Sequence, residues 1–90
     1  MEMIFKTEAL LDLNYWKRSG NVAVQKRIQT LLKKISENPY IGIGKPELLK
    51  YDLSGYWSRR INNEHRIIYK VYEDRNTIEI HSLKGHYNDK

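Results

Sequence analysis

Residues 22–37 carry an apolar stripe that only a helix packed on a larger apolar surface can bury. The stripe is formed by Val24, Ile28, Leu31, Leu32 and Ile35. This spacing places all five side chains on one face of an α-helix. Asn21 is the expected N-cap, and Asn38 ends the helix because the following Pro39 disfavours the helical conformation at its predecessor. The sequence therefore predicts a long amphipathic helix.

A shorter helix is predicted just before it. Its apolar side chains also recur at helical spacing: Leu10, Leu13 and Trp16. Thr7 is the expected N-cap, and Gly20 is expected to end the helix in the left-handed conformation. Because only Gly20 and Asn21 separate the two helices, we predict a helical hairpin.

The second half of the chain is rich in β-branched and aromatic residues. Strands are predicted over residues 56–61, 65–72 and 77–83, with a short N-terminal strand over residues 3–6. Polar turns at 62–64 and 73–76 favour an antiparallel meander. We expect an α+β fold of two layers, in which the helical hairpin packs on a twisted antiparallel sheet within one domain spanning residues 1–90.

Strand alternation separates the arginines of this sheet. Ser58 and Arg60 share one face, opposite Trp57, Arg59 and Ile61. In the next strand Ile67, Tyr69 and Val71 are apolar and should face the helices, which leaves Arg66 and Lys70 on the open face. If the turn places Arg60 across from Arg66, the two like charges favour an anion between them. The sequence leaves this register open.

A carboxylate and an imidazole complete a candidate site for acid–base chemistry. Glu47 is flanked by Lys45 and Lys50, and nearby cations favour its ionised form. His86 and Tyr87 stand almost at the C-terminus. A base, a group of cations and an acid suffice to cleave a phosphodiester through its own 2′-hydroxyl without a metal.

Composition narrows the class of partner. The net charge of +5 favours a polyanion. Residues 1–45 hold eight Lys/Arg against four Asp/Glu, and residues 46–90 hold eight against seven.

The absence of cysteine excludes thiolate metal sites, and the three histidines show no metal-ligand spacing, so we expect no metal and no cofactor. His65 and His81 are expected to be structural. No apolar run suits a membrane span or a signal peptide, so we expect a cytoplasmic protein.

Several segments resemble one family of toxins. The stretch GKPELLKYDLSGYWSRRINNEHRIIYKVY, the LNYW of the first helix and the terminal KGHY are similar to the YoeB/Txe toxins of the RelE superfamily. The resemblance covers nearly the whole chain. It implies a RelE-like, microbial-ribonuclease-type fold and an endoribonuclease that cleaves messenger RNA in the ribosomal A site. It also implies neutralisation by a cognate acidic antitoxin, similar to YefM or Axe.

The family's functional residues fall on matching positions of this chain. The implied catalytic residues are Glu47, Arg66, His86 and Tyr87. The implied phosphate-binding residues are Lys50, Arg60 and Lys84. Glu47 would take the proton of the 2′-hydroxyl and His86 would protonate the departing 5′-oxygen, although these two roles are open to exchange. One departure is that many members end in RYHY, whereas this chain has Lys84 and Gly85 before His86.

Other functions remain to be distinguished. A RelE-fold relative that poisons DNA gyrase would not cleave RNA, and Glu47 and His86 argue against it. A passive RNA- or ribosome-binding module would inhibit translation without His86. A plain partner-binding domain would not arrest growth. The sequence also leaves open codon preference and whether the protein forms a homodimer.

Overall fold

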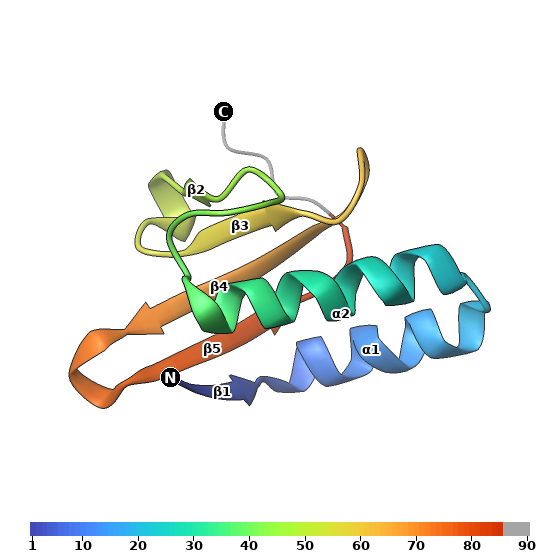
Figure 1. Ribbon diagram of the computed structural model, residues 1–90, viewed down its shortest axis with the longest axis horizontal. Coiled ribbons are helices and arrows are strands. Elements are labelled where there is room, and N and C mark those ends of the chain that lie inside the picture. Colours follow the sequence, from blue (N-terminus) through green and yellow to red (C-terminus); the bar gives the residue numbers. More distant parts are fainter. Residues whose placement is uncertain (86–90) are drawn as a thin grey trace.

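Two helices cover one face of a five-stranded sheet in the computed structural model, which describes residues 1–85 (Figure 1). The helices are α1 (Thr7–Ser19) and α2 (Val22–Glu37). The strands are β1 (Glu2–Phe5), β2 (Glu47–Leu48), β3 (Trp57–Arg60), β4 (Arg66–Tyr72) and β5 (Thr77–Ser82). Two short 3-10 helices are η1 (Tyr51–Leu53) and η2 (Glu73–Arg75). The expected two-layer α+β fold is confirmed.

The sheet is mixed rather than wholly antiparallel. Its strand order is β1-β5-β4-β3-β2, and the three central strands form the expected meander. The edge strand β1, however, runs parallel to β5. Lys6 is the only residue between β1 and α1, so β1 must run toward the end of the sheet where α1 begins. Side chains alternate between the two faces in the same way along parallel and antiparallel strands, so the sequence pattern does not reveal the strand direction. The prediction of a wholly antiparallel sheet was wrong at this edge for that reason.

The same connection shifts the first helix cap by one residue. Lys6 donates its N–H to the carbonyl of Ile80 at 2.9 Å, which continues the sheet pairing and holds Lys6 extended. Lys6 is therefore the N-cap, and Thr7, the expected cap, is already helical. The other two caps are confirmed, with Gly20 left-handed at φ 72° and the Asn21 side chain accepting from Val24 N at 3.1 Å.

The main core lies between the helices and the sheet. It contains Ala9, Trp16, Val24, Ile28, Leu31, Ile35, Ile61, Ile67, Tyr69, Ile78, Ile80 and Leu83. The predicted stripe of α2 supplies four of these residues, and Leu32 packs at the margin. Because this face of the sheet is covered, polar chemistry is directed to the other face.

Candidate functional site

Arg60 and Arg66 lie directly opposite each other across β3 and β4. This is the register that the sequence left open. Arg60 is exposed and Arg66 is partly buried. The Nη1 of Arg66 donates to the carbonyls of Asn62 at 2.8 Å and His65 at 3.2 Å, which orients its guanidinium at the hairpin turn. The ion pairs found within residues 1–85 lie elsewhere. Two neighbouring guanidiniums of this kind favour an anion between them.

Both arginines lie on the face of the sheet away from the helices. Arg59 pairs with Ile67, and both are fully buried on the helix side. Because side chains alternate along a strand, Arg60 and Arg66 face the opposite way. The expected open-face position of both residues is confirmed.

Glu47 lies on the same face as the arginine pair. It belongs to β2, a two-residue edge strand, and it is exposed. Its partner across the strands is Ser58, two residues before Arg60. Residues diagonal in an antiparallel pair are about 7–8 Å apart, within reach of long side chains. The fold therefore places Glu47 diagonally across from Arg60, which lies opposite Arg66 on the same face.

The open face is hollowed beside these residues. Just after β2, Leu49 N donates to the carbonyl of Tyr56, a residue that lines the hollow, at 2.8 Å. Leu49 is itself buried, although it lies outside the main core. A hollow of about 330 Å³ is lined by Glu8, Leu53, Tyr56, Ile68, His81, Ser82, Lys84 and Gly85. Ile68 is two residues from Arg66 on the same face, so the hollow adjoins the arginine pair.

The other predicted site residues differ in how closely they join this group. Lys50 is exposed just after β2, at the start of η1. The Nζ of Lys84 lies 4.4 Å from the ring centroid of Tyr15, so this cation is held against α1. His86 and Tyr87 lie outside the described residues.

The two described histidines make structural contacts. His81 lies 3.2 Å from a carboxylate oxygen of Glu79, and the edge of its ring meets Tyr56. His65 stands just before β4 rather than within it, and its ring packs edge-on against Trp16. Within residues 1–85 no cluster of three His, Cys, Asp or Glu side chains could hold a metal ion.

Arg59 is a supporting residue to which the sequence assigned no role. Its guanidinium is fully buried and donates to three carbonyls of the loop before β2. These acceptors are Asn38 O at 2.5 Å, Ile41 O at 3.0 Å and Ile43 O at 3.2 Å. Alternation had placed Arg59 on the helix side among apolar residues, and this position was the signal for a buried cation. Because the loop runs into β2, Arg59 supports the strand that carries Glu47.

The surrounding residues fit closely around this guanidinium. The hydroxyl of Tyr69 accepts from Arg59 Nε at 3.2 Å and donates to Pro39 O at 2.6 Å. Burial raises the pKa of Tyr69, and the contact with Arg59 partly offsets this shift. A Cβ at Gly42, where φ is 131°, would stand 3.0 Å from the Nη1 of Arg59. The loop at this point therefore requires glycine.

Tyr40 ties the same loop to the far end of the sheet. Its hydroxyl donates to the carboxylate of Glu73, and this hydrogen bond is the main reason that its pKa is raised to about 12. Its ring also packs on Trp57 of β3. The loop before Glu47 is thus held from both sides.

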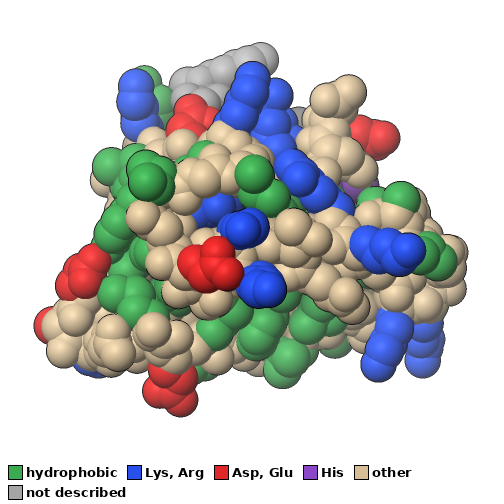
Figure 2. Space-filling view, viewed as in Figure 1, with side chains coloured by type: hydrophobic (Ala, Val, Ile, Leu, Met, Phe, Trp, Pro, Cys, Tyr) green, Lys and Arg blue, Asp and Glu red, His purple; other side chains and the backbone are tan. Residues whose placement is uncertain are grey.

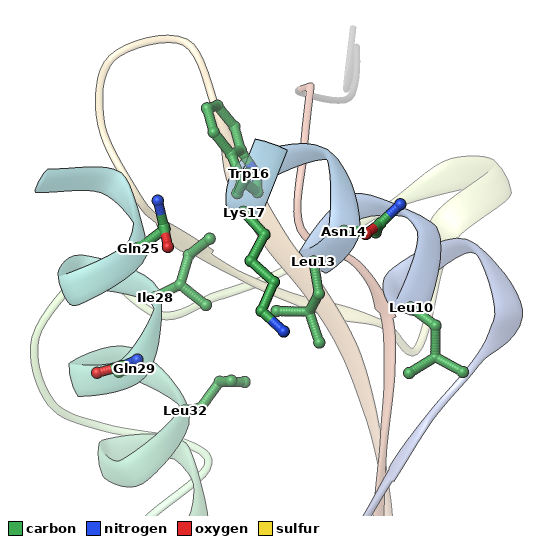
Figure 3. A pocket seen from close by; sticks show the side chains of 9 residues that line it. All are labelled: Leu10, Leu13, Asn14, Trp16, Lys17, Gln25, Ile28, Gln29 and Leu32. Carbon is green, nitrogen blue, oxygen red and sulfur yellow. The ribbon is translucent and has the colours of Figure 1, made fainter. Parts of the chain in front are cut away.

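A second hollow, of about 330 Å³, lies between the helices and away from the arginine pair (Figure 3). Its lining residues are Leu10, Leu13, Asn14, Trp16, Lys17, Gln25, Ile28, Gln29 and Leu32. Leu13 and Ile28 extend into the gap from opposite helices, and Lys17 reaches between them (Figure 3). None of the predicted site residues lines this groove.

Positive charge also spreads over the outer side of α2. Figure 2 shows Lys and Arg side chains gathered along this helix and above it. The helix carries Lys26, Arg27, Lys33 and Lys34. Lys34 forms an ion pair with Glu37 at 3.5 Å, and Glu37 is the only acidic residue of the helix. A second cationic surface is therefore available to a polyanion.

The fold is shared with toxins of low sequence similarity. The toxin–antitoxin complex RelBE2 of Mycobacterium tuberculosis contains a chain that is 19% identical, with a TM-score of 0.69 over 94% of this chain and 96% of that one. At this identity the likeness shows the fold alone.

Other relatives are similar in both sequence and structure. Residues 5–87 match a family described as the YoeB-like toxin of bacterial type II toxin-antitoxin systems. Toxin YoeB of Escherichia coli (strain K12) is 41% identical over 87 residues, covering 97% of this chain and all of its own length. Toxin YoeB of Synechocystis sp. is 50% identical over 72 residues, or 80% of this chain and 81% of that protein.

Solved structures give the same result. A YoeB/ParE toxin from Agrobacterium tumefaciens aligns with a TM-score of 0.89 at 34% identity, over 97% of this chain and all of that one. The YoeB dimer from Staphylococcus aureus aligns with a TM-score of 0.83 at 44% identity, over 97% and 98%. The chain belongs to the YoeB-like toxin family of bacterial type II toxin–antitoxin systems, and the expected resemblance is confirmed. Among residues 1–85 no helix is long and apolar enough to cross a membrane.

Proposed function

We propose that this toxin is an endoribonuclease that cleaves messenger RNA in the ribosomal A site. The observation that carries the proposal is the meeting of Arg60, Arg66 and Glu47 on one face of the sheet. Two cations and a carboxylate on one face of the sheet match a phosphodiester and the hydroxyl that attacks it. The adjoining hollow offers room for a nucleotide beside the scissile phosphate.

The proposed reaction is an internal transfer within the RNA. Glu47 takes the proton from the ribose 2′-hydroxyl, and the resulting oxygen attacks the neighbouring phosphorus. Arg66, helped by Arg60 and Lys50, stabilises the charge that develops on the phosphate oxygens. The bond from phosphorus to the 5′-oxygen then breaks, and His86 gives that oxygen a proton. The products are a 2′,3′-cyclic phosphate and a free 5′-hydroxyl.

Glu47 and His86 could exchange the roles of base and acid, and the pH dependence of the rate separates the two assignments. A group that acts as base contributes only when deprotonated, and one that acts as acid only when protonated. Removing Glu47 should therefore abolish one limb of the pH–rate profile, and removing His86 the other. If Glu47 is the base, the limb lost with Glu47 is the one at low pH.

Two further residues are proposed to hold the RNA. Tyr87 stacks on a base near the cut, where stacking contributes about 1–3 kcal/mol. Lys84 binds a phosphate from the margin of the site. This residue lines the hollow, and its amine stands over the ring of Tyr15. The cations of α2 would face ribosomal RNA, whose phosphates favour such a surface.

The partners of the relatives guide the proposal for this chain. Solved structures from Staphylococcus aureus include a heterotetrameric YoeB–YefM toxin–antitoxin complex and a YoeB dimer. We propose that this chain likewise binds a cognate YefM- or Axe-like antitoxin and can form a homodimer. An acidic segment of the antitoxin would order on the arginine face, so that neutralisation follows from covering the site.

Mapping the ends of RNA after induced expression tests the activity. We expect new 5′-hydroxyl ends within translated codons, and at least a 10²-fold slower reaction for Glu47→Ala and Arg66→Ala when purified ribosomes are supplied. Arg18→Ala is the matched control, because Arg18 is an exposed arginine of α1, in the helix layer that covers the opposite face of the sheet. Growth arrest without new RNA ends would refute ribonuclease activity and favour a non-cleaving toxin.

A further inference from the structure

The chain just beyond β5 is held by side chains from distant parts of the sequence. Leu83 donates its N–H to Asp12 Oδ2 at 2.9 Å and accepts at its carbonyl from Trp16 Nε1 at 2.8 Å. Both contacts are buried. Two residues of α1 therefore satisfy both backbone polar groups of Leu83, a place where no strand is available to do so.

The next contact holds Gly85, the last residue that the structure describes. Its N–H donates to Nδ1 of His65 at 2.8 Å, and its carbonyl accepts from the N–H of Arg66 at 2.9 Å. The ring of His65 is itself fixed edge-on against Trp16, with centroids 4.8 Å apart. Asp12, Trp16 and His65 are called the terminal clamp below.

The clamp requires a particular form of His65. Nδ1 accepts a hydrogen bond, so the neutral ring must carry its proton on Nε2. Gly85 is left-handed at φ 74°, a conformation that glycine adopts without steric cost. A residue with this freedom keeps one conformation only if its surroundings define it. The hydrogen bond from Gly85 N–H to His65 fixes the orientation of the peptide group that precedes Gly85.

We infer that His65 is a positioning residue that fixes the backbone immediately before His86. The inference rests on the proposed function, because it assigns His65 the task of directing the general acid. Gly85 is hydrogen-bonded to the backbone of Arg66, and His86 is the next residue in the sequence. The clamp thus sets where the chain leaves the sheet beside the arginine that faces the phosphate.

Rigid placement of this kind has a measurable effect on rate. A displacement of about 1 Å at a reacting group can lower a rate by about 10²-fold. Loss of the acceptor at His65 would free the N–H of Gly85 and widen the range of directions open to the next residue. If His65 were only structural, its replacement would lower the stability of the protein, and the effect on the cleavage rate would not depend on His86.

The test compares His65→Asn with His65→Leu. Asn and Leu are close in size, and both lose the ring packing on Trp16. Only Asn keeps an acceptor near the position of Nδ1. We expect His65→Asn to retain cleavage within a few-fold of wild type, whereas His65→Leu lowers kcat by about 10–10²-fold with little change in KM.

Making the same two substitutions in a His86→Ala background shows whether His65 acts by positioning His86 or only by stabilising the fold. There we expect His65→Asn and His65→Leu to cleave at the same residual rate, since no general acid remains to be placed. Equal rates of the two variants in the full-length protein would overturn the inference. So would a loss in His65→Leu that persists in full without His86.

Hydrogen exchange of the Gly85 amide provides a readout that needs no RNA. It should stay slow in wild type and His65→Asn and become fast in His65→Leu, while amides of β4 exchange alike in both variants. Fast exchange in wild type would overturn the inference. A wild-type protein that cuts no RNA would instead refute the proposed function, and the exchange of Gly85 would still decide whether His65 holds the chain.

Discussion

Arg59 and Arg60 are adjacent in sequence, and the same substitution should affect them very differently. Arg59 is fully buried, with four hydrogen bonds to loop carbonyls and to Tyr69. Arg60 is exposed. We therefore compare Arg59→Met with Arg60→Met, since methionine keeps much of the aliphatic stem and removes the charge.

The magnitude follows from the contacts of Arg59. A hydrogen bond to a charged group contributes about 1.5–3 kcal/mol, so four of them set an upper bound of about 6–12 kcal/mol. Burying the guanidinium itself costs several kcal/mol, and the exposed loop lets water reach some of the freed carbonyls. We expect a net loss of about 2–4 kcal/mol for Arg59→Met, and less than about 0.5 kcal/mol for Arg60→Met.

Thermal and urea denaturation measure this difference. A domain of this size has a total stability of about 5–13 kcal/mol, and each kcal/mol moves Tm by about 4–8 °C. Arg59→Met should melt at least about 8 °C below wild type, and Arg60→Met within a few degrees of it. If both variants melt together, the carbonyl contacts of Arg59 contribute no net stability and the loop before Glu47 is held by other contacts.

Three further predictions follow from the described contacts. Arg66→Lys should slow cleavage at least about tenfold without lowering Tm, because lysine cannot bind phosphate through two parallel hydrogen bonds; wild-type kinetics would exclude this role. A chain truncated after Gly85 should melt close to full length, since the main core as described precedes Gly85 and residues 86–90 include no Ala, Val, Ile, Leu or Met, yet cleave at least about 10²-fold more slowly; full activity would refute the role of His86. The pKa of Tyr40 is raised to about 12 by its hydrogen bond to Glu73, so its shift stabilises the fold below pH 10 and this contribution is lost as pH rises through 12; if the phenol that distinguishes wild type from Tyr40→Phe in an absorbance titration ionises at or below pH 10, the prediction is contradicted.

Local patterns in the sequence determined the helices and the faces of the strands. Gly20 and Asn21 separate the helices because one residue favours the left-handed conformation and the other caps a helix with its own side chain. Alternation along β4 placed Arg66 on the open face because successive side chains of a strand point in opposite directions. Such signals act between neighbours in sequence, so they are readable without the fold.

Tertiary structure alone decided the direction of β1, the register of Arg60 on Arg66 and which loop carbonyls accept from the buried Arg59. Alternation is identical in parallel and antiparallel strands, and a hairpin turn of three residues permits more than one register. A buried guanidinium is stable only if carbonyls from a separate loop converge on it. The contact of His65 with Gly85 likewise joins residues 20 apart, and only the packed sheet brings them together.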